Sequence, residues 1–413
     1  MKIYGDLTEI KSFVRIFLVT LILAVVAGFL LVNYTDLFSE TEVTPPQGGS
    51  HADENYLGHN LHEPAPVREQ REGREVEFPF PQSDYMSGGG LFELPVSGAG
   101  GFAAVALTVF SEPNRGSSRV LELDAGQGFT IISEYENWWN INVQGTTGWV
   151  QHRYCFINLP DVIPSIVYNI TNAQSSVLKA SHYAIPNVTG YALYQAHGFN
   201  ERLGRYEFVV PTLYIMARRI ATAQQYALSD GNTLIIYEIF RPAQVQELIV
   251  DNMRDLMNAN PTVRAGVTSY PWSLGWFINT GTSNHQRAAA MDVSLGRVLY
   301  AEMIETGNYE FLNITSYFEF EMQTIMHELS DAAAVFTRPV QVHSPTAWQT
   351  ARHHQNVTPA TLLLQYYCTK AGFIPLASEW WHFNDLASIN LAQNIGIRGD
   401  FFIERSYSVP PIE

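Results

Sequence analysis

Two histidines and one aspartate in the last third of the chain have the residue types of a metal site. His285 and Asp292 stand seven residues apart in the stretch SNHQRAAAMD, and His382 stands in the stretch EWWHF. Zinc in hydrolases takes three protein ligands from His, Asp or Glu and leaves the fourth position to water. The three residues therefore predict one catalytic zinc site, although a lone histidine is by default a structural residue of a core.

Two further residues have the chemistry to complete a hydrolysis. Glu379 stands three residues before His382, near enough to take a proton from the attacking water and pass it to the leaving amine. Arg241 follows the apolar run TLIIYEI in the sequence EIFRP. A fixed guanidinium that faces the attacked carbonyl would neutralise the oxyanion formed there. We therefore assign Glu379 as the general base and Arg241 as the electrophile.

The elements that must position these residues lie in residues 159–413, where helical and strand-like runs are mixed. Apolar residues recur at helical spacing in 206–227, 242–256 and 359–371, whereas 233–239 has the composition of a buried strand. We expect His285 in a loop and Asp292 on a strand that leads out of the core. Because no strict βαβ repeat is present, the pattern favours an α+β domain.

Together these stretches resemble the zinc peptidases that act on D-alanyl-D-alanine, namely the VanX-type dipeptidases and VanY-type carboxypeptidases. The family's S-x-H-x-x-G-x-A-x-D motif appears as SNHQRAAAMD, its E-x-x-H motif as EWWH and its Y-R-P as FRP. The resemblance covers about residues 183–385. It implies one zinc ion per chain on His285, Asp292 and His382, with Glu379 and Arg241 as catalytic residues. The residues that it places at the substrate are Ser283, Tyr183, Asn187 and Glu238.

Several positions depart from the family pattern. Ala288 replaces the motif glycine, which predicts either an ordinary backbone or a shifted loop, because glycine alone adopts left-handed angles freely. Residues 309–357 form a longer segment than the family has, and we expect an insertion that reshapes the pocket. His327 opens the sequence HELSD, which begins like the helical zinc motif H-E-x-x-H but ends in Asp. We therefore expect His327 on a solvated helix face.

Residues 101–158 have a different texture, with short β-rich runs separated by turn residues, as in a small all-β barrel. The segment resembles a bacterial SH3-type domain, since a strand that opens with Trp138 and Trp139 precedes a GWV strand that contains Trp149. The resemblance implies a module that often binds peptidoglycan. The alternative is that these tryptophans only fill a small core.

The N-terminal part predicts a membrane attachment. Residues 13–33 are almost entirely apolar, and about 20 such residues span a bilayer as a helix. The basic flank should stay inside, which predicts a cytoplasmic segment at 1–12 and a single-pass anchor in the cell membrane. A cleaved signal peptide that ends near Ala27 is the alternative. Residues 34–100 are rich in Pro, Gly and charge, which predicts a flexible linker.

The overall composition limits the partners. The chain has 24 basic and 40 acidic residues and a net charge of −16, which excludes the electrostatic footprint of a nucleic-acid-binding protein. Its two cysteines, Cys155 and Cys368, are too few for a disulfide framework, and we expect both thiols to be unpaired.

The sequence thus predicts an α+β zinc peptidase domain behind an SH3-like barrel and a transmembrane helix. Its function would be that of an extracytoplasmic carboxypeptidase that trims peptidoglycan stem peptides. Since EWWHF is nearer the dipeptidase branch, a D-Ala-D-Ala dipeptidase is the second interpretation, although free D-Ala-D-Ala is a cytoplasmic metabolite. A third interpretation, motivated by Ala288, is a non-catalytic wall-binding protein with a decayed fold, and the intact catalytic set argues against it.

Overall fold

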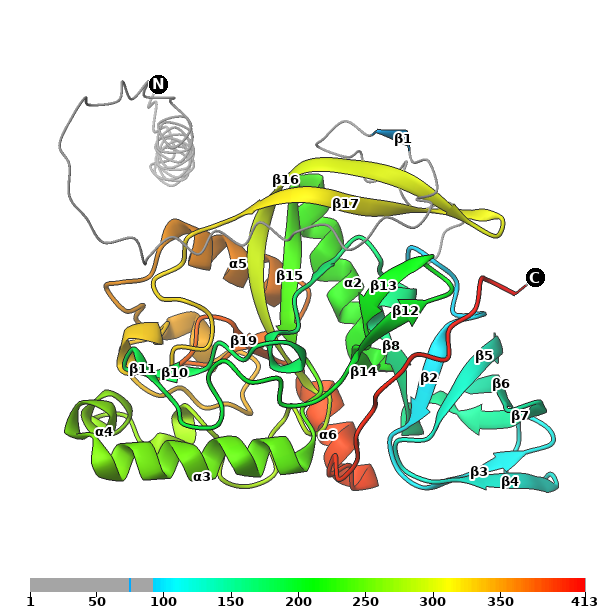
Figure 1. The fold of residues 1–413 in the computed structure, drawn as a ribbon, viewed down its shortest axis with the longest axis horizontal. Coiled ribbons are helices and arrows are strands. Elements are labelled where there is room, and N and C mark those ends of the chain that lie inside the picture. Colours follow the sequence, from blue (N-terminus) through cyan, green and yellow to red (C-terminus); the bar gives the residue numbers. More distant parts are fainter. Residues whose placement is uncertain (1–73, 76–91, 413) are drawn as a thin grey trace, which may run out of the picture. The chain divides into compact units, whose positions relative to one another are not determined.

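The structure is a computed structural model that describes residues 74–75 and 92–412 (Figure 1). The predicted cytoplasmic segment 1–12 and membrane anchor 13–33 lie outside these residues. Within the described part of the chain, no helix has both the length and the apolar composition needed to cross a membrane.

A seven-stranded mixed sheet forms the centre of the C-terminal domain. Its path runs through β18 (Ile374–Pro375), β19 (His382–Asn384), β16 (Ala290–Thr306), β15 (Asn232–Glu238) and β9 (Val167–Tyr168), while β17 (Tyr309–Glu319) and β1 (Arg74–Glu75) also pair with β16. β15 is parallel to β9 and antiparallel to β16. All seven residues of β15 are buried, which agrees with the strand predicted at 233–239. The long β16–β17 hairpin extends beyond the rest of the sheet in Figure 1.

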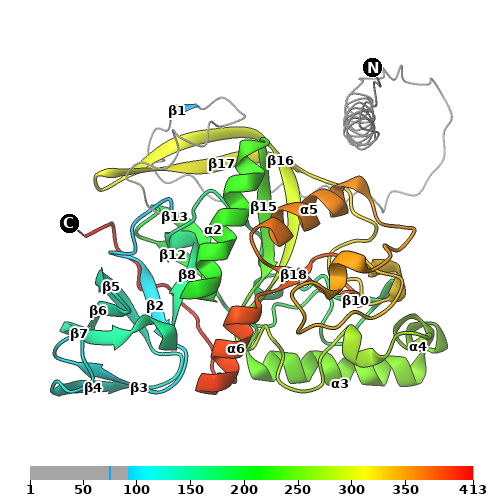
Figure 2. The same ribbon diagram turned by 180° about the vertical axis from the view of Figure 1, so that it is seen from behind.

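Five α-helices of the described residues accompany this sheet. They are α2 (Tyr214–Ser229), α3 (Ala243–Ala259), α4 (Pro261–Thr268), α5 (Pro359–Lys370) and α6 (Leu386–Ile395). Figure 2 shows α2 in front of β15, and both α5 and α6 contact α2. The helix predicted at 206–227 begins later, at Tyr214, because its first residues form the strands β13 (Arg205–Phe208) and β14 (Pro211–Leu213). Pairing with neighbouring strands here overrides the helical spacing.

The SH3-like barrel shares a strand with the peptidase domain. Its eight-stranded sheet runs β14 (Pro211–Leu213), β8 (Cys155–Asn158), β2 (Gly100–Ala103), β5 (Gly128–Tyr135), β6 (Trp138–Val143), β7 (Thr146–Gln151), β3 (Leu107–Phe110) and β4 (Arg119–Leu123). Trp139 is fully buried, whereas Trp149 is half-buried. One hydrophobic core includes buried residues of both the barrel and the peptidase domain. The barrel and the peptidase domain therefore form one packed unit. Both cysteines are buried and free, as predicted.

The flexible linker predicted at 34–100 extends too far toward the C-terminus. Within 34–100, Leu94 and Ala99 are buried, and the amide of Gly98 donates to the carbonyl of Ile131 in the barrel (2.7 Å). These residues pack because they supply apolar side chains and backbone donors. The average composition of 34–100 did not indicate this, because Pro, Gly and charged residues dominate the rest of the segment.

The buried side chain of Arg202 connects residues 95–97, which precede the barrel, to the start of the peptidase domain. Its side chain is fully buried, and its guanidinium donates to the carbonyl oxygens of Asp161 (2.8 Å), Ser97 (2.7 Å) and Pro95. The Asp161 carboxylate, also buried, accepts from the amide of Gly100 (2.8 Å). A single guanidinium thus joins the approach to the barrel to the start of the peptidase domain.

We expect Arg202→Ala to destabilise the chain by about 3–5 kcal/mol, because it removes a buried cation beside a buried carboxylate. Urea unfolding at neutral pH measures this change. The control Arg254→Ala removes a surface pair with Asp251 (3.5 Å) and should cost less than about 1 kcal/mol. Equal effects of the two substitutions would contradict a structural role for Arg202.

Candidate active site

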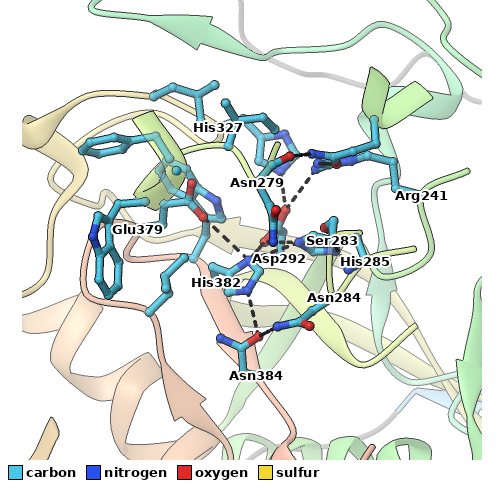
Figure 3. A pocket seen from close by; sticks show the side chains of 18 of the residues that line it. Arg241, Asn279, Ser283, Asn284, His285, Asp292, His327, Glu379, His382 and Asn384 are labelled. Atoms are coloured by element: carbon cyan, nitrogen blue, oxygen red, sulfur yellow. Dashed lines mark hydrogen bonds and ion pairs between the residues drawn. The ribbon is translucent and has the colours of Figure 1, made fainter. Parts of the chain in front are cut away.

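The register of the central sheet brings three predicted residues together. Asp292 on β16 stands directly opposite His382 on β19, and directly opposite Glu238 on β15. Side chains of directly opposite residues share one face of a sheet. His285 comes from the loop before β16, and its backbone carbonyl accepts from the amide of Arg241 (3.2 Å). The residues meet because the end of β15 and the starts of β16 and β19 lie at the same end of the sheet. Figure 3 shows His285, Asp292 and His382 gathered there.

His285, Asp292 and His382, called here the metal-binding trio, present three ligand atoms to one point. Nε2 of His285 lies 3.1 Å from Nδ1 of His382 and 3.3 Å from Oδ1 of Asp292, and the last two atoms lie 3.0 Å apart. Donors bound to a tetrahedral zinc at about 2.1 Å stand about 3.4 Å from one another. All three side chains are nearly fully buried. The donor set therefore fits a single zinc ion.

In both His285 and His382, the ring nitrogen that points away from the trio has a hydrogen-bond partner. The other ring nitrogen is therefore available to bind a metal ion. Nδ1 of His285 lies 3.1 Å from the carbonyl oxygen of Ile239, and Nε2 of His382 lies 3.2 Å from Oδ1 of Asn384. Such contacts fix the tautomer and the ring orientation of a metal ligand. Burial lowers the pKa of His382, which favours its neutral form. Burial would raise the pKa of Asp292, but the surrounding histidines hold it well below its usual range.

Glu379 lies beside the trio without belonging to it. Its Oε2 is 3.6 Å from Nδ1 of His382, and the side chain lines the cavity. Burial first, and the charge of Asp292 second, raise the pKa of Glu379 well above its usual range. A buried carboxylate beside the metal position can both accept and return a proton. The geometry therefore agrees with the role predicted for it.

Arg241 reaches the site from the side opposite Glu379 (Figure 3). Its Nε donates to Oε2 of Glu238 (3.0 Å), and one terminal nitrogen donates to Gln246 (2.7 Å). Burial would lower the pKa of Arg241, but Glu238 more than offsets this and raises it. The guanidinium is therefore a fixed cation that borders the cavity.

Glu238, predicted to contact substrate, is not among the residues that line the cavity. It is fully buried, and its second oxygen accepts from Asn172 (2.6 Å). Because its lone pairs point at Arg241 and Asn172, Glu238 positions the arginine. Ser283 does line the cavity, and its hydroxyl accepts from the amide of His285 (3.1 Å), so it also shapes the metal-binding loop.

The structure places Tyr183 and Asn187 outside the residues that line the cavity, so it does not bring them together with the metal-binding trio. The Tyr183 side chain is exposed on β11 (Tyr183–Ala184), the partner of β10 (Lys179–Ala180). Asn187 is also exposed and donates to Asn252 on α3 (2.8 Å).

Ala288 keeps the backbone that glycine usually provides. Its φ is 49°, in the left-handed region, and its amide donates to the carbonyl of His285 (3.0 Å). The backbone at Ala288 is therefore not ordinary, and of the two alternatives predicted for this position that one is wrong. The closed turn accepts an alanine at some cost in strain, and the metal-binding trio stays assembled.

His327 is the site residue that the sequence analysis missed. It belongs to a turn instead of a helix, is 1% exposed, and places Nε2 3.1 Å from Oδ2 of Asp292. Together with Leu329 and Val342 it brings the segment 309–357 into the wall of a cavity of about 260 Å³. The expectation that this segment shapes the pocket agrees with that lining.

Comparison with known proteins agrees with this geometry. Residues 212–395 match the family model described as D-Ala-D-Ala dipeptidase, and residues 105–155 match the model of a bacterial SH3 domain. The chain carries a peptidase domain of this dipeptidase family. The matched segment contains the metal-binding trio as well as Glu379 and Arg241.

The peptidase domain is also similar to a curated protein. D-alanyl-D-alanine dipeptidase of Escherichia coli (strain K12) is 28% identical over 201 residues, which span 48% of this chain and 72% of that protein. The similarity supports the hydrolase class of the domain.

Proposed function

We propose that the chain is a zinc carboxypeptidase that removes the terminal D-alanine from peptidoglycan stem peptides outside the cell membrane. The observation that carries this proposal is the convergence of the metal-binding trio, Glu379 and Arg241 on one cavity. A zinc ion held by the trio would polarise the scissile carbonyl and make water a better nucleophile at neutral pH.

The chain's own residues would carry the proton and the charge. Glu379 accepts a proton from the attacking water at its carboxylate and returns it to the nitrogen of the departing D-alanine. Arg241 faces the carbonyl oxygen as negative charge develops on it, and Glu238 with Gln246 keeps the guanidinium in place. The apolar residues Trp276, Phe277 and Leu376 line the cavity and would exclude bulk water.

The charges of the cavity wall support a carboxypeptidase over a dipeptidase. Asp292 and Glu379 are the acidic residues among the described residues that line the cavity, and both have roles in the metal site. A free dipeptide would bring an ammonium group that needs a further carboxylate, because a buried charge without a partner is costly. The amino end of a stem peptide is acylated, so no such partner is required.

The location rests on separate features. The apolar segment 13–33 would anchor the chain with the peptidase domain outside, where peptidoglycan is found. The SH3 domain supports a wall substrate, since such modules often bind peptidoglycan. D-Ala-D-Ala dipeptidase is the second candidate activity, and the Escherichia coli relative favours it.

Digestion of two matched substrates separates these activities. The purified full chain is incubated either with an acylated stem pentapeptide that ends in D-Ala-D-Ala or with free D-Ala-D-Ala, and released D-alanine is quantified. We expect release of one D-alanine per pentapeptide and little cleavage of the dipeptide. Cleavage confined to the free dipeptide would overturn the carboxypeptidase assignment.

Removal of metal tests the class of mechanism. We expect a strong chelator to abolish D-alanine release and one equivalent of zinc to restore it, because the zinc ion held by the trio would be the group that activates the attacking water. The measurement is D-alanine release before chelation, after dialysis and after zinc addition. Full activity in a chain shown to be free of metal would contradict a zinc mechanism.

A further inference from the structure

His327 contacts the oxygen of Asp292 that does not face the other histidines. Oδ1 of Asp292 lies 3.0 Å from His382 and 3.3 Å from His285, whereas Oδ2 lies 3.1 Å from Nε2 of His327. An ionised carboxylate only accepts hydrogen bonds, so Nε2 of His327 must carry the proton and donate. The two oxygens of Asp292 therefore have separate partners.

The His327 ring is held in this position from several directions. It meets the rings of Trp381 and Tyr237 edge-on, at centroid distances of 5.9 and 6.4 Å. Its backbone has a φ of 60°, and its carbonyl accepts from the amide of Lys179 (3.1 Å). Histidine is among the residues that tolerate this left-handed conformation better than most. The ring is thus placed by packing and by backbone geometry together.

The next residue, Glu328, locks the same turn. Its carboxylate is fully buried and accepts from the amide of His182 at 3.0 and 3.1 Å. Leu329 returns a backbone hydrogen bond to Lys179 (2.8 Å), which seats the turn on the β10–β11 hairpin. A turn fixed in this way can hold a donor at a constant distance from the metal site.

One polar atom of His327 makes no compensating contact. Nδ1 is buried and has no hydrogen-bond partner among the described residues. A buried unsatisfied nitrogen costs free energy that a leucine or phenylalanine would avoid. The only polar contact of the ring in this part of the chain is therefore the one with Asp292, which argues that this contact is the reason for a histidine here.

We propose that His327 is a positioning residue that restricts Asp292 to binding zinc through Oδ1 alone. By engaging Oδ2, it prevents the carboxylate from turning to bind through both oxygens, which would fill the coordination position needed by water or the substrate carbonyl. This inference rests on the proposed zinc site.

A second metal ion is the competing interpretation, because Glu238, Asp292 and His327 also form a close group of ligand atoms. However, Arg241 already occupies that side. Its guanidinium donates to Glu238 (3.0 Å) and lies 3.9 Å from Oδ2 of Asp292. A divalent cation placed there would be repelled by this fixed charge, so the group is a hydrogen-bonded support of the first site.

The test measures zinc affinity and ligand geometry in the full chain. His327→Ala should weaken zinc binding by about 10- to 100-fold in competition with a chromophoric chelator, as loss of such a partner does in other metal sites. His327→Gln keeps an N–H donor and should restore most of the affinity. His343→Ala, which removes an exposed histidine of the same segment, should bind as the wild type does.

Cobalt substitution reports the coordination directly. In His327→Ala the visible absorption of bound cobalt should fall, because a carboxylate bound through both oxygens raises the coordination number, and His327→Gln should recover it. Thermal unfolding shows whether each variant is folded. A folded His327→Ala with wild-type zinc affinity and cobalt spectrum would overturn this inference and leave the proposed function intact.

Two other results are equally decisive. Two zinc ions per wild-type chain, falling to one in His327→Ala, would overturn positioning in favour of a second metal site. A wild-type chain that binds no zinc would contradict the proposed function and this inference together.

Discussion

Glu379→Gln should lower kcat for D-alanine release by about 100- to 10,000-fold, the range that a positioned general base contributes. The amide is almost the same size as the carboxyl group, so the wall of the cavity keeps its shape, but the amide cannot accept the proton of the attacking water. Because Glu379 lies outside the metal-binding trio, zinc binding should be unchanged. Steady-state kinetics on the acylated pentapeptide and metal analysis of the same sample give both values.

The matched control is Glu319→Gln. Glu319 is another carboxylate of the peptidase domain and is half-buried where Glu379 is buried, but it accepts from the hydroxyl of Tyr237 (2.9 Å) and does not line the cavity. Its substitution should leave kcat within a few-fold of the wild type. Activity that survives Glu379→Gln would remove Glu379 from the mechanism and return attention to the other groups of the site.

The second large effect is expected at Arg241. Arg241→Ala should lower kcat by about 100- to 1,000-fold, as loss of an oxyanion donor does in other hydrolases. It should also destabilise the fold by about 3–5 kcal/mol, because Glu238 is then a buried carboxylate without its cation. Kinetics and urea unfolding measure the two effects separately.

The double variant Arg241→Ala/Glu238→Gln distinguishes catalysis from stability. Glu238→Gln removes the unpaired charge and should recover much of the lost stability, while kcat stays low because no guanidinium faces the carbonyl oxygen. If activity returned together with stability, Arg241 would be a structural residue, and the oxyanion would need another partner.

The metal-binding trio was predictable because its residues occur in short sequence motifs, and strand pairing in the sheet brings those motifs together. Asp292 lies on a strand after an apolar run, and strand pairing then sets His382 opposite to it. Arg241 follows the buried strand that ends at Glu238, so its position near the site could also be predicted. Local patterns of this kind carry enough information because the chemistry requires both the residue type and the spacing.

His327 could not be found in the same way. The pattern H-E-x-x suggested a solvated helix, but the backbone of His327 is left-handed, and its position depends on Lys179, far away in the sequence. Likewise, β14 (Pro211–Leu213) pairs with β8 of the barrel, a contact that overrides helical spacing. Tyr183 and Asn187 are exposed and lie outside the cavity lining, and Asn187 contacts Asn252 of α3 instead. Long-range packing decided each of these cases.

The zinc site is tested by the zinc content of the purified full chain, measured together with D-alanine release from the acylated pentapeptide before and after chelation. We expect one zinc ion per chain and a release that disappears with the metal and returns with it. A folded chain that holds no zinc, or one whose release is indifferent to chelation, would contradict the assignment of His285, Asp292 and His382 as the ligands of a catalytic metal ion.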